Sequence, residues 1–544
     1  MGRSSVEVTT SSYKFTAMAV TALSAMSILI IACIIIFPTP FSNLTQKFFF
    51  PIQDNKNSSS VQEPPLDQSC ISRSQKAAYH KSPSPVPSPY FLSKLSDYER
   101  RHKNCEPFSE PFNKTLQVLV TGKNVPSNET DSDPCRYVVY TVNLHGLGNR
   151  MLGLSSAFLY ALLTNRTVLV DFRPDMASLF CEPFQNSTWF LPDDFPFRNE
   201  FYTAQFRQAH SFGDFLMRHN NVTQLATPPS FLHLYLSFNY NNRDKLFFED
   251  ENQQFLQGVP WLTLRSDEYF IPYLYLMPRF RPELERLFPD RETVFHHLGR
   301  YLFSPSNQVW GLITRFFDAY LARADERIGL QIRVFNTTSS PIPLVMKQIW
   351  QCTEKENLLP QLQEPTTSPS AMIGYNKTAS PATTKAVLIA SLYSEFYEEM
   401  KFMYWTSGAV DGGEVVGVHQ ASHEGSQHSK NSSHNMKALV DMYLLSLCDV
   451  LVTSPWSTFG YVAQGIGGLK PWMLNIPNSK DSVEKPLEPA CRRAVSSEPC
   501  FLRPPSYDMR AKVVVDTGVG LDPPAVHCED VSWGLKLVND QKID

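Results

Sequence analysis

One arginine of this chain interrupts a run of apolar residues. Arg333 stands in Gly-Leu-Gln-Ile-Arg-Val-Phe, which is typical of a buried strand, and it lies close to the expected end of that strand. A guanidinium stays charged, so its burial requires a partner. Ligands bind at the carboxyl ends of strands in open α/β sheets, and a diphosphate would accept two hydrogen bonds from a planar guanidinium. Either a diphosphate or an internal carboxylate would therefore satisfy Arg333.

Two further loops join an apolar run to a helical pattern, and each could bind a phosphate. One is HGLGNR, residues 145 to 150, and the other is VTSPWSTFGY, residues 452 to 461, with Ser457 and Thr458 where a helix should begin. The N–H groups and the dipole at a helix N-terminus attract anions. The alternatives are a tight turn that needs glycine in the first loop, and helix capping by the hydroxyls in the second.

Other polar motifs indicate packing or solvated turns. His296 and His297 are adjacent, so their side chains would point apart on a helix, and no nearby carboxylate completes a set of metal ligands. The chain has 49 basic and 53 acidic residues, and no basic stretch is interleaved with aromatic residues. This balance argues against a nucleic-acid partner and favours an uncharged one.

Alternating strand and helix patterns must position these groups. The runs YVVYTVNL and VLVDF flank a helical pattern, and residues 175 to 295, dense in aromatic residues and proline, are expected to complete this first lobe. After a helix from about Ser306, a second set of strand patterns follows: RIGLQIRVF, KAVLIASL, EVVGVHQ, DVLVTS and PWMLNI. We therefore predict an α/β protein of two lobes with parallel sheets, and a polar surface insertion within residues 336 to 383.

The N-terminal part of the chain predicts a membrane anchor. Phe15 to Phe37 carry no charge and are long enough, as a helix, to cross a hydrocarbon core of roughly 30 Å. A cleaved signal peptide is the alternative, but its apolar region is usually shorter. The organisation we predict is a cytoplasmic tail, the anchor, a stem rich in proline and serine, two lobes and a closing segment, at residues 1–14, 15–37, 38–90, 91–325, 326–500 and 501–544.

Two residue counts favour an oxidising, glycosylating lumen for the part beyond the anchor. Nine of the ten cysteines lie there, at spacings that match no zinc site, so we expect disulfides, with Cys448 left free in an apolar helical pattern. Glycosylation sequons are found at Asn43, Asn57, Asn113, Asn128, Asn165, Asn186, Asn221, Asn336, Asn376 and Asn431.

Three motifs in one order give the chain a family resemblance. GLGNR, GLQIRVF and TSPWSTFGYVAQGIGGLKPW resemble the plant xyloglucan fucosyltransferases, and so do FCEPF, VPWLTLRSDEYF, TVFHHLGRYLF, NQVWGLITRF, MYLLSL and HCEDVSWGLKLV. The resemblance extends from about Tyr90 to Val538 and leaves out the stem and residues 360 to 383. It implies two Rossmann-like lobes, a variant of the GT-B type, in a single-pass type II protein of the Golgi membrane.

The resemblance also implies an activity. Such an enzyme moves L-fucose from GDP-fucose to the 2-hydroxyl of a galactose on xyloglucan or an arabinogalactan glycan, with inversion and without a metal ion or other cofactor. Two alternatives remain open: a transferase that uses another sugar nucleotide, and an inactive glycan-binding membrane glycoprotein.

The resemblance also implies which residues form the site, position by position. Arg333 would bind the donor diphosphate, and the resemblance implies a donor site that also includes Gly146, Asn149, Arg150, His419, Ser457, Thr458 and Phe459. Asp267 and Asp530 would bind or activate the acceptor. Asp267 is the first candidate for the base that deprotonates the acceptor hydroxyl, and a relay through water is the alternative.

Overall fold

The computed structural model describes residues 70–80, 83–121, 134–142, 145–172, 174–219, 228–238, 240, 242–362, 383–407, 414–476, 487–508, 513–514 and 524–540. The predicted anchor at Phe15 to Phe37, the tail before it, and the first part of the predicted stem lie outside these residues. Within them, no helix combines the length and apolar character needed to cross a bilayer.

The first lobe is built on a parallel sheet of four strands in the order β2-β1-β4-β3. Val, Leu and aromatic side chains dominate these strands and are buried on both faces, as expected for a parallel sheet covered by helices. The strands are β1 (Tyr137–Thr141), β2 (Thr167–Asp171), β3 (Phe231–Leu236) and β4 (Trp261–Ser266).

The second lobe has a sheet of six strands in the order β10-β9-β8-β5-β6-β7. All neighbours are parallel except β10, which runs antiparallel to β9. The strands are β5 (Glu326–Ile332), β6 (Thr383–Ser391), β7 (Glu414–His419), β8 (Val450–Thr453), β9 (Trp472–Leu474) and β10 (Cys491–Arg493). The prediction of an α/β fold with parallel sheets is confirmed.

Helices follow most strands of both lobes. In the first lobe and the segments around it they are α2 (Ile71–Gln75), η2 (Lys76–Tyr79), α3 (Pro89–Asn104), α4 (Glu110–Thr121), α5 (Leu147–Leu163), α6 (Pro174–Ala177), α7 (Ala204–His210), α8 (Phe212–Arg218), η4 (Asp244–Phe248), α9 (Asp250–Gln257), α10 (Ile271–Leu276), α11 (Arg281–Leu287), η5 (Arg291–Thr293), α12 (Val294–Leu302), α13 (Asn307–Phe316) and the π-helix η6 (Phe317–Leu321).

The second lobe adds α14 (Ile342–Lys355), α15 (Glu395–Thr406), α16 (Ser432–Ser446) and α17 (Thr458–Gly467). The closing segment contributes two short hairpins, β11 (Tyr507–Asp508) with β12 (Val513–Val514), and β13 (Ala525–His527) with β14 (Leu535–Leu537). Between β5 and β6, α14 packs its apolar side on the second sheet, and most of the predicted surface insertion, residues 363–382, lies outside the described part.

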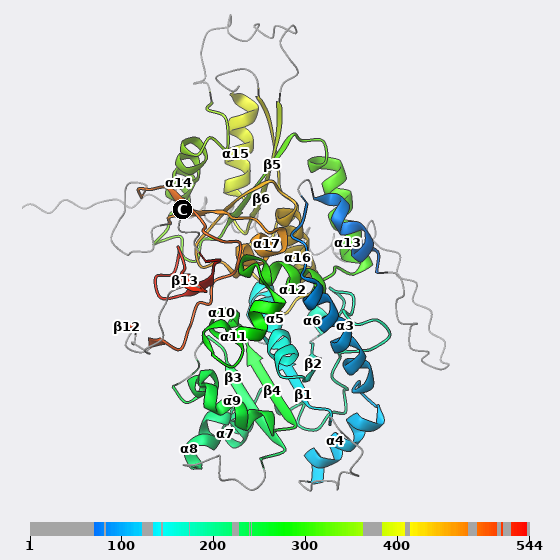
Figure 1. Cartoon of the computed structure of the whole chain (residues 1–544). Helices are drawn as coiled ribbons and strands as arrows, with labels where there is room; N and C mark the ends of the chain where they lie inside the picture. Colours follow the sequence, from blue (N-terminus) through cyan, green and yellow to red (C-terminus); the bar gives the residue numbers. More distant parts are fainter. Residues whose placement is uncertain are drawn as a thin grey trace, which may run out of the picture. The chain divides into compact units, whose positions relative to one another are not determined.

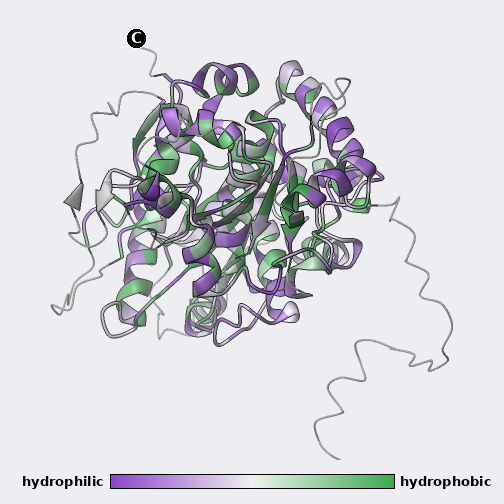
Figure 2. Ribbon diagram, turned by 90° about the horizontal axis from the view of Figure 1, so that it is seen from below, coloured by the Kyte–Doolittle hydropathy of each residue, from purple (hydrophilic) through white to green (hydrophobic). Residues whose placement is uncertain are grey.

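Four helices join the lobes into one core. α17 packs against α5, α12 and α16, and the largest cluster of buried apolar residues includes side chains from both lobes. Figure 1 shows these helices between the sheet of β1 to β4 and the strands β5 and β6. Hydrophobic residues gather on the central strands and hydrophilic ones on the outer helices (Figure 2). The edge where the lobes meet is therefore held in place from both sides.

Four disulfides join residues 28 to 139 positions apart in the described part of the chain: Cys70–Cys181, Cys105–Cys135, Cys352–Cys491 and Cys500–Cys528. Cys448 is free and buried. The prediction of disulfides with Cys448 left over is confirmed.

Residues 70–80, called the strap below, fold onto the first lobe, although composition assigned them to the stem. Besides the disulfide of Cys70 with Cys181, the strap accepts a hydrogen bond of 2.9 Å from the indole N–H of Trp310 to the side-chain oxygen of Gln75. Contacts with distant residues, which composition does not report, decide where this segment lies.

Candidate functional site

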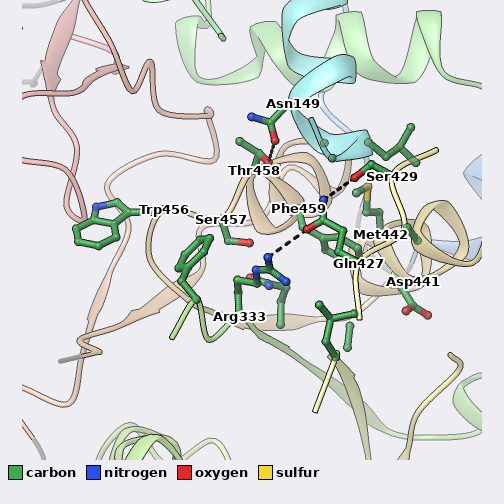
Figure 3. Close-up of a pocket in the computed structure, with 18 of the residues that line it drawn as sticks. Asn149, Arg333, Gln427, Ser429, Asp441, Met442, Trp456, Ser457, Thr458 and Phe459 are labelled. Carbon is green, nitrogen blue, oxygen red and sulfur yellow. Dashed lines mark hydrogen bonds between the residues drawn. The ribbon is translucent and has the colours of Figure 1, made fainter. Parts of the chain in front are cut away.

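A cavity of about 540 Å³ lies where the two lobes meet. Its walls come from the carboxyl ends of β5 and β6, the N-termini of α5 and α17, helix α16 with the loop before it, and the closing segment. Figure 3 shows side chains from several of these elements around it. Parallel sheets bind ligands at this edge, because loops and helix N-termini converge there.

Arg333 follows β5 directly and lines the cavity. Its backbone N–H donates to the Ser454 hydroxyl at 2.8 Å, and its guanidinium donates to the side-chain oxygen of Gln427 at 3.1 Å (Figure 3). Burial lowers the pKa of the guanidinium, which nevertheless remains a cation. Across the described ranges no carboxylate lies within ion-pair distance of it. The internal ion pair that the sequence left open is not formed there.

The N-termini of α5 and α17 meet at the cavity. The Thr458 hydroxyl donates to the Asn149 side-chain oxygen at 2.7 Å. A Cβ on Gly148 would stand 2.7 Å from the Thr458 carbonyl oxygen, so this approach requires glycine. Ser457 is the N-cap residue of α17, but its hydroxyl makes no capping hydrogen bond. Two helix N-termini beside one arginine form a site for an anion.

Trp456 enters the cavity wall with a strained backbone. Its φ is 57°, which a bulky residue rarely adopts. One oxygen of the buried Asp530 accepts hydrogen bonds from the Trp456 backbone N–H at 2.8 Å and from the Tyr461 hydroxyl at 2.6 Å. Burial raises the pKa of Asp530. Asp530 thus holds the loop before α17 from behind and does not line the cavity.

Asp267 also lies behind the cavity wall. The side chain is fully buried after β4, and one of its oxygens accepts hydrogen bonds of 2.7 Å from the Ser237 hydroxyl and from the Phe238 backbone N–H. The other oxygen contacts Nδ1 of His145, whose side chain is 48% exposed. This hydrogen bond is the main cause of a raised pKa for His145. The imidazole, and not the carboxylate, is therefore the group that reaches solvent.

Asp441 is a buried acid in the opposite wall, on α16. One of its oxygens accepts a hydrogen bond from the Ser422 hydroxyl, while the other is buried and has no hydrogen-bond partner in the described part of the chain. Burial raises the pKa of Asp441 to about 7. Such a carboxylate can accept hydrogen bonds from a ligand that brings its own N–H donors.

Potential metal ligands are few. The described residues contain one cluster, Cys500, Cys528 and Asp530, and its two sulfurs form a disulfide, so they are not thiolates. His296 is buried between helices, with Nδ1 3.3 Å from the Gly465 carbonyl oxygen. The adjacent histidines pack within the fold, as predicted from their spacing.

The geometry combines a cation, two helix N-termini and a lone buried acid at the edge of a parallel sheet. The model of the family described as xyloglucan fucosyltransferase matches residues 61–510. The chain belongs to the xyloglucan fucosyltransferase family. The resemblance seen in the sequence motifs is thereby confirmed.

Individual family members are similar over most of their length. A galactoside 2-alpha-L-fucosyltransferase of Pisum sativum is 49% identical over 476 residues, covering 87% of this chain and 80% of the relative. One of Arabidopsis thaliana is 48% identical over 474 residues, covering 87% and 81%. A solved structure of an Arabidopsis thaliana FUT1 mutant in complex with GDP shares 46% identity and a TM-score of 0.73, covering 88% of this chain and 98% of that one.

The structure brings together only some of the residues that the family resemblance pointed to. Gly146, Asn149, Arg333, Ser457, Thr458 and Phe459 line the cavity. Arg150 does not. Its guanidinium is fully buried, 2.5 Å from an oxygen of Asp175, and it donates to the Ser429 carbonyl oxygen at 2.7 Å. Arg150 therefore ties the first lobe to the loop before α16 instead of facing the cleft.

His419 lies apart from the cavity, at the end of the edge strand β7. Its ring centroid is 5.2 Å from that of Tyr320 in η6, and burial lowers its pKa. The difference from the expectation has a simple cause. The second sheet places β7 beside β6 and away from β8, so the two strand ends that carry His419 and Ser457 are not neighbours.

Sequence reasoning missed the wall formed by α16 and the loop before it. Gln427, Ser429 and Asp441 line the cavity there. Asp441 did carry a signal, because it stands alone in the apolar stretch Ala-Leu-Val-Asp-Met-Tyr-Leu-Leu, just as Arg333 does in its strand. A single charge in a buried element indicates a partner or a ligand.

Proposed function

We propose that this family member is an inverting fucosyltransferase, which transfers L-fucose from GDP-fucose to the 2-hydroxyl of a galactose residue on xyloglucan or an arabinogalactan glycan. The observation that carries the proposal is Arg333, a cation beside the N-termini of α5 and α17 and without a carboxylate partner among the described residues. The names of the relatives from pea and Arabidopsis and the GDP complex of FUT1 support the same activity.

The donor diphosphate would lie against Arg333 and the N-terminus of α17. As the bond between the anomeric carbon and the phosphate oxygen breaks, negative charge grows on the diphosphate. A fixed guanidinium and a helix N-terminus stabilise that charge, and the enzyme we propose needs no metal ion for it.

The guanine base would lie against Asp441. Guanine presents N1–H and the 2-amino group as neighbouring donors, and a carboxylate accepts both. The unpartnered oxygen of Asp441 supports this assignment, since a buried acceptor without a donor is costly unless a ligand supplies one. Discrimination against uracil nucleotides follows from the same pairing.

The acceptor hydroxyl would be deprotonated by His145 in this scheme. The 2-hydroxyl oxygen attacks the anomeric carbon from the face opposite the diphosphate, GDP leaves, and the hydroxyl proton passes to the free ring nitrogen of His145. Asp267 holds the other nitrogen and stabilises the imidazolium that forms. Both Asp267 oxygens already accept hydrogen bonds, so Asp267 acts as a positioning residue in this scheme. The role of base, first assigned to Asp267 from the sequence, passes to His145.

We further propose that the two sheets form Rossmann-like lobes of a GT-B-type variant, in a single-pass type II protein of the Golgi membrane with its catalytic part in the lumen. Two parallel sheets that face each other across the donor cavity support the fold. Four disulfides support an oxidising compartment.

The test is transfer by the full chain in detergent, with GDP-fucose or UDP-galactose as donor and galactosylated xyloglucan or arabinogalactan oligosaccharides as acceptors. We expect fucose on the galactose 2-hydroxyl, and a loss of about 10²- to 10³-fold for Arg333→Ala. Transfer from UDP-galactose instead, or binding of the glycans without transfer from either donor, would replace the proposal with one of its two alternatives.

A further inference from the structure

A second cavity, of about 290 Å³, lies in the first lobe and shares no lining residue with the donor cavity. It is bounded by β3, by η4, and by α7 and α8, which pack on β3. The residues that carry the argument are Arg207, Gln208, Asp214, His233, Tyr235 and Asp244.

His233 is the buried polar group of this cavity. Only 1% of the residue is exposed, and Nδ1 lies 2.8 Å from the Thr263 hydroxyl. Nε2 is buried and has no hydrogen-bond partner in the described part of the chain. Burial lowers the pKa of His233 to about 3, so the imidazole is neutral. A neutral ring nitrogen that is buried without a partner destabilises the fold unless a ligand supplies a hydrogen bond to it.

The other walls favour an uncharged ligand with many hydroxyls. The Arg207 guanidinium lies over the Tyr235 ring, 5.1 Å from the ring centroid. The stacked pair offers a flat face with N–H donors at its edge. The Asp214 carboxylate pairs with the Arg243 guanidinium. Arg207 and Asp244 carry opposite charges, so the lining has no excess positive charge to favour a phosphate or a carboxylate. A sugar ring fits this lining, because each hydroxyl both donates and accepts and the ring has an apolar face.

Strand register connects this cavity to the proposed reaction centre. Tyr235 pairs with Arg265 across β3 and β4, and His233 pairs with Thr263. Asp267 follows Arg265 by two residues, and Ser237, which donates to Asp267, follows His233 by four. At about 3.3 Å per residue, His233 lies about 13 Å along the strand from the Asp267 level, which is the length of a few sugar rings.

The surface between the two levels is aromatic and cationic. The Arg265 guanidinium lies 5.3 Å from the centroid of Tyr202 and 5.9 Å from that of Tyr235. Rings and guanidinium planes of this kind stack against the apolar faces of sugars. A polysaccharide laid along this face would pass from the His145 and Asp267 pair to the cavity beside His233.

We infer that the cavity beside His233 is a subsite for an uncharged sugar residue of the acceptor polysaccharide, a few residues away from the galactose that receives fucose. The inference rests on the proposed function, because it takes the acceptor to be a long glycan. The cavity would set the preference for a polymer over a short galactoside.

The test replaces an exposed residue of α7 with a larger one whose side chain would fill the cavity. Gln208 lines the cavity on α7, and Gln205 is exposed on the same helix but does not line it, so Gln208→Tyr is tested against Gln205→Tyr. For Gln208→Tyr in the full chain we expect the KM for galactosylated xyloglucan to rise about tenfold, equivalent to about 1.4 kcal/mol. The KM values for GDP-fucose and for lactose should not change, and Gln205→Tyr should match the wild type. A change of equal size for xyloglucan and lactose, or no change for either, would overturn the inference.

A binding measurement separates this inference from the proposed function. Saturation-transfer NMR of the full chain in detergent would use a xyloglucan oligosaccharide without galactose as the probe. Binding that is lost in Gln208→Tyr and kept in Gln205→Tyr supports the sugar subsite even if no fucose is transferred. A wild type that transfers fucose but binds this probe no better than Gln208→Tyr refutes the subsite and leaves the proposed function intact.

Discussion

The Thr458 hydroxyl donates a hydrogen bond of 2.7 Å to the side-chain oxygen of Asn149, and so joins the first turns of α17 and α5. The two residues are 309 positions apart in the sequence. The donor cavity lies at this junction, so its shape depends on how closely the two helices approach.

Gly148 should be the position where the junction of α5 and α17 is most sensitive to substitution. A Cβ there would stand 2.7 Å from the Thr458 carbonyl oxygen and 2.8 Å from its carbon, and backbone cannot yield as a side chain does. We expect Gly148→Ala to lower the free energy of unfolding by about 1 to 3 kcal/mol and to reduce transfer. Gly425→Ala is the control, because its Cβ would meet nothing within 4 Å. Thermal unfolding and initial rates measure both, and a Gly148→Ala enzyme as stable and active as Gly425→Ala would contradict this account.

Donor affinity should depend on pH through Asp441. Burial raises the pKa of this carboxyl to about 7, and guanine donors bind the carboxylate form. Affinity for GDP should therefore rise between pH 6 and pH 8, as the carboxyl loses its proton. Asp441→Asn should remove this rise and weaken GDP binding at pH 8 by about 1.5 to 3 kcal/mol. Calorimetric titration with GDP and UDP measures it, and an equal loss for both nucleotides would argue against a contact with guanine.

The pH–rate profile should report the contact between His145 and Asp267. A base works when unprotonated, so kcat/KM should rise with pH through the pKa of His145. The hydrogen bond that the His145 ring donates to the Asp267 carboxylate raises that pKa, so Asp267→Asn should move the rising limb to lower pH as well as slow the reaction. His145→Gln should lose about 10²- to 10⁴-fold. An unmoved limb in Asp267→Asn would rule out His145 as the titrating group.

Asp530 should act through Trp456. It accepts a hydrogen bond from the Trp456 backbone N–H and keeps this residue at a φ of 57° in the cavity wall. Asp530→Ala and Trp456→Ala should each reduce kcat/KM, and the double variant should be little worse than either one. Additive losses would indicate that Asp530 contributes to the reaction independently of Trp456.

Part of this site could be predicted from sequence because its signals are local. A charge in a strand, glycines in a loop and hydroxyls before a helix mark Arg333, Gly146 and Ser457 within a few residues of chain. The alternation of strands and helices predicted both parallel sheets, and the odd number of cysteines beyond the predicted anchor predicted one free thiol.

What the sequence did not reveal depends on distant partners. Arg150 follows the conspicuous glycine loop, but the carboxylate that pairs with its buried guanidinium is Asp175. Nothing near Arg150 in the chain indicates this pairing. The position of His419 depends on strand order, which periodicity does not contain. Residues 175 to 295 of the first lobe, dense in aromatic residues and proline, gave no pattern that separates strand from helix, although β3 and β4 lie there.

The strap has a mechanical consequence. Cys70 is bonded to Cys181, next to Phe180, and Ser72 and Gln75 fasten the following turn to the start of α13. A pull on the chain ahead of Cys70 is therefore transmitted through a covalent sulfur bond into the body of the first lobe. The load therefore bypasses α2 and α3, which follow Cys70 in the chain and would otherwise unwind first.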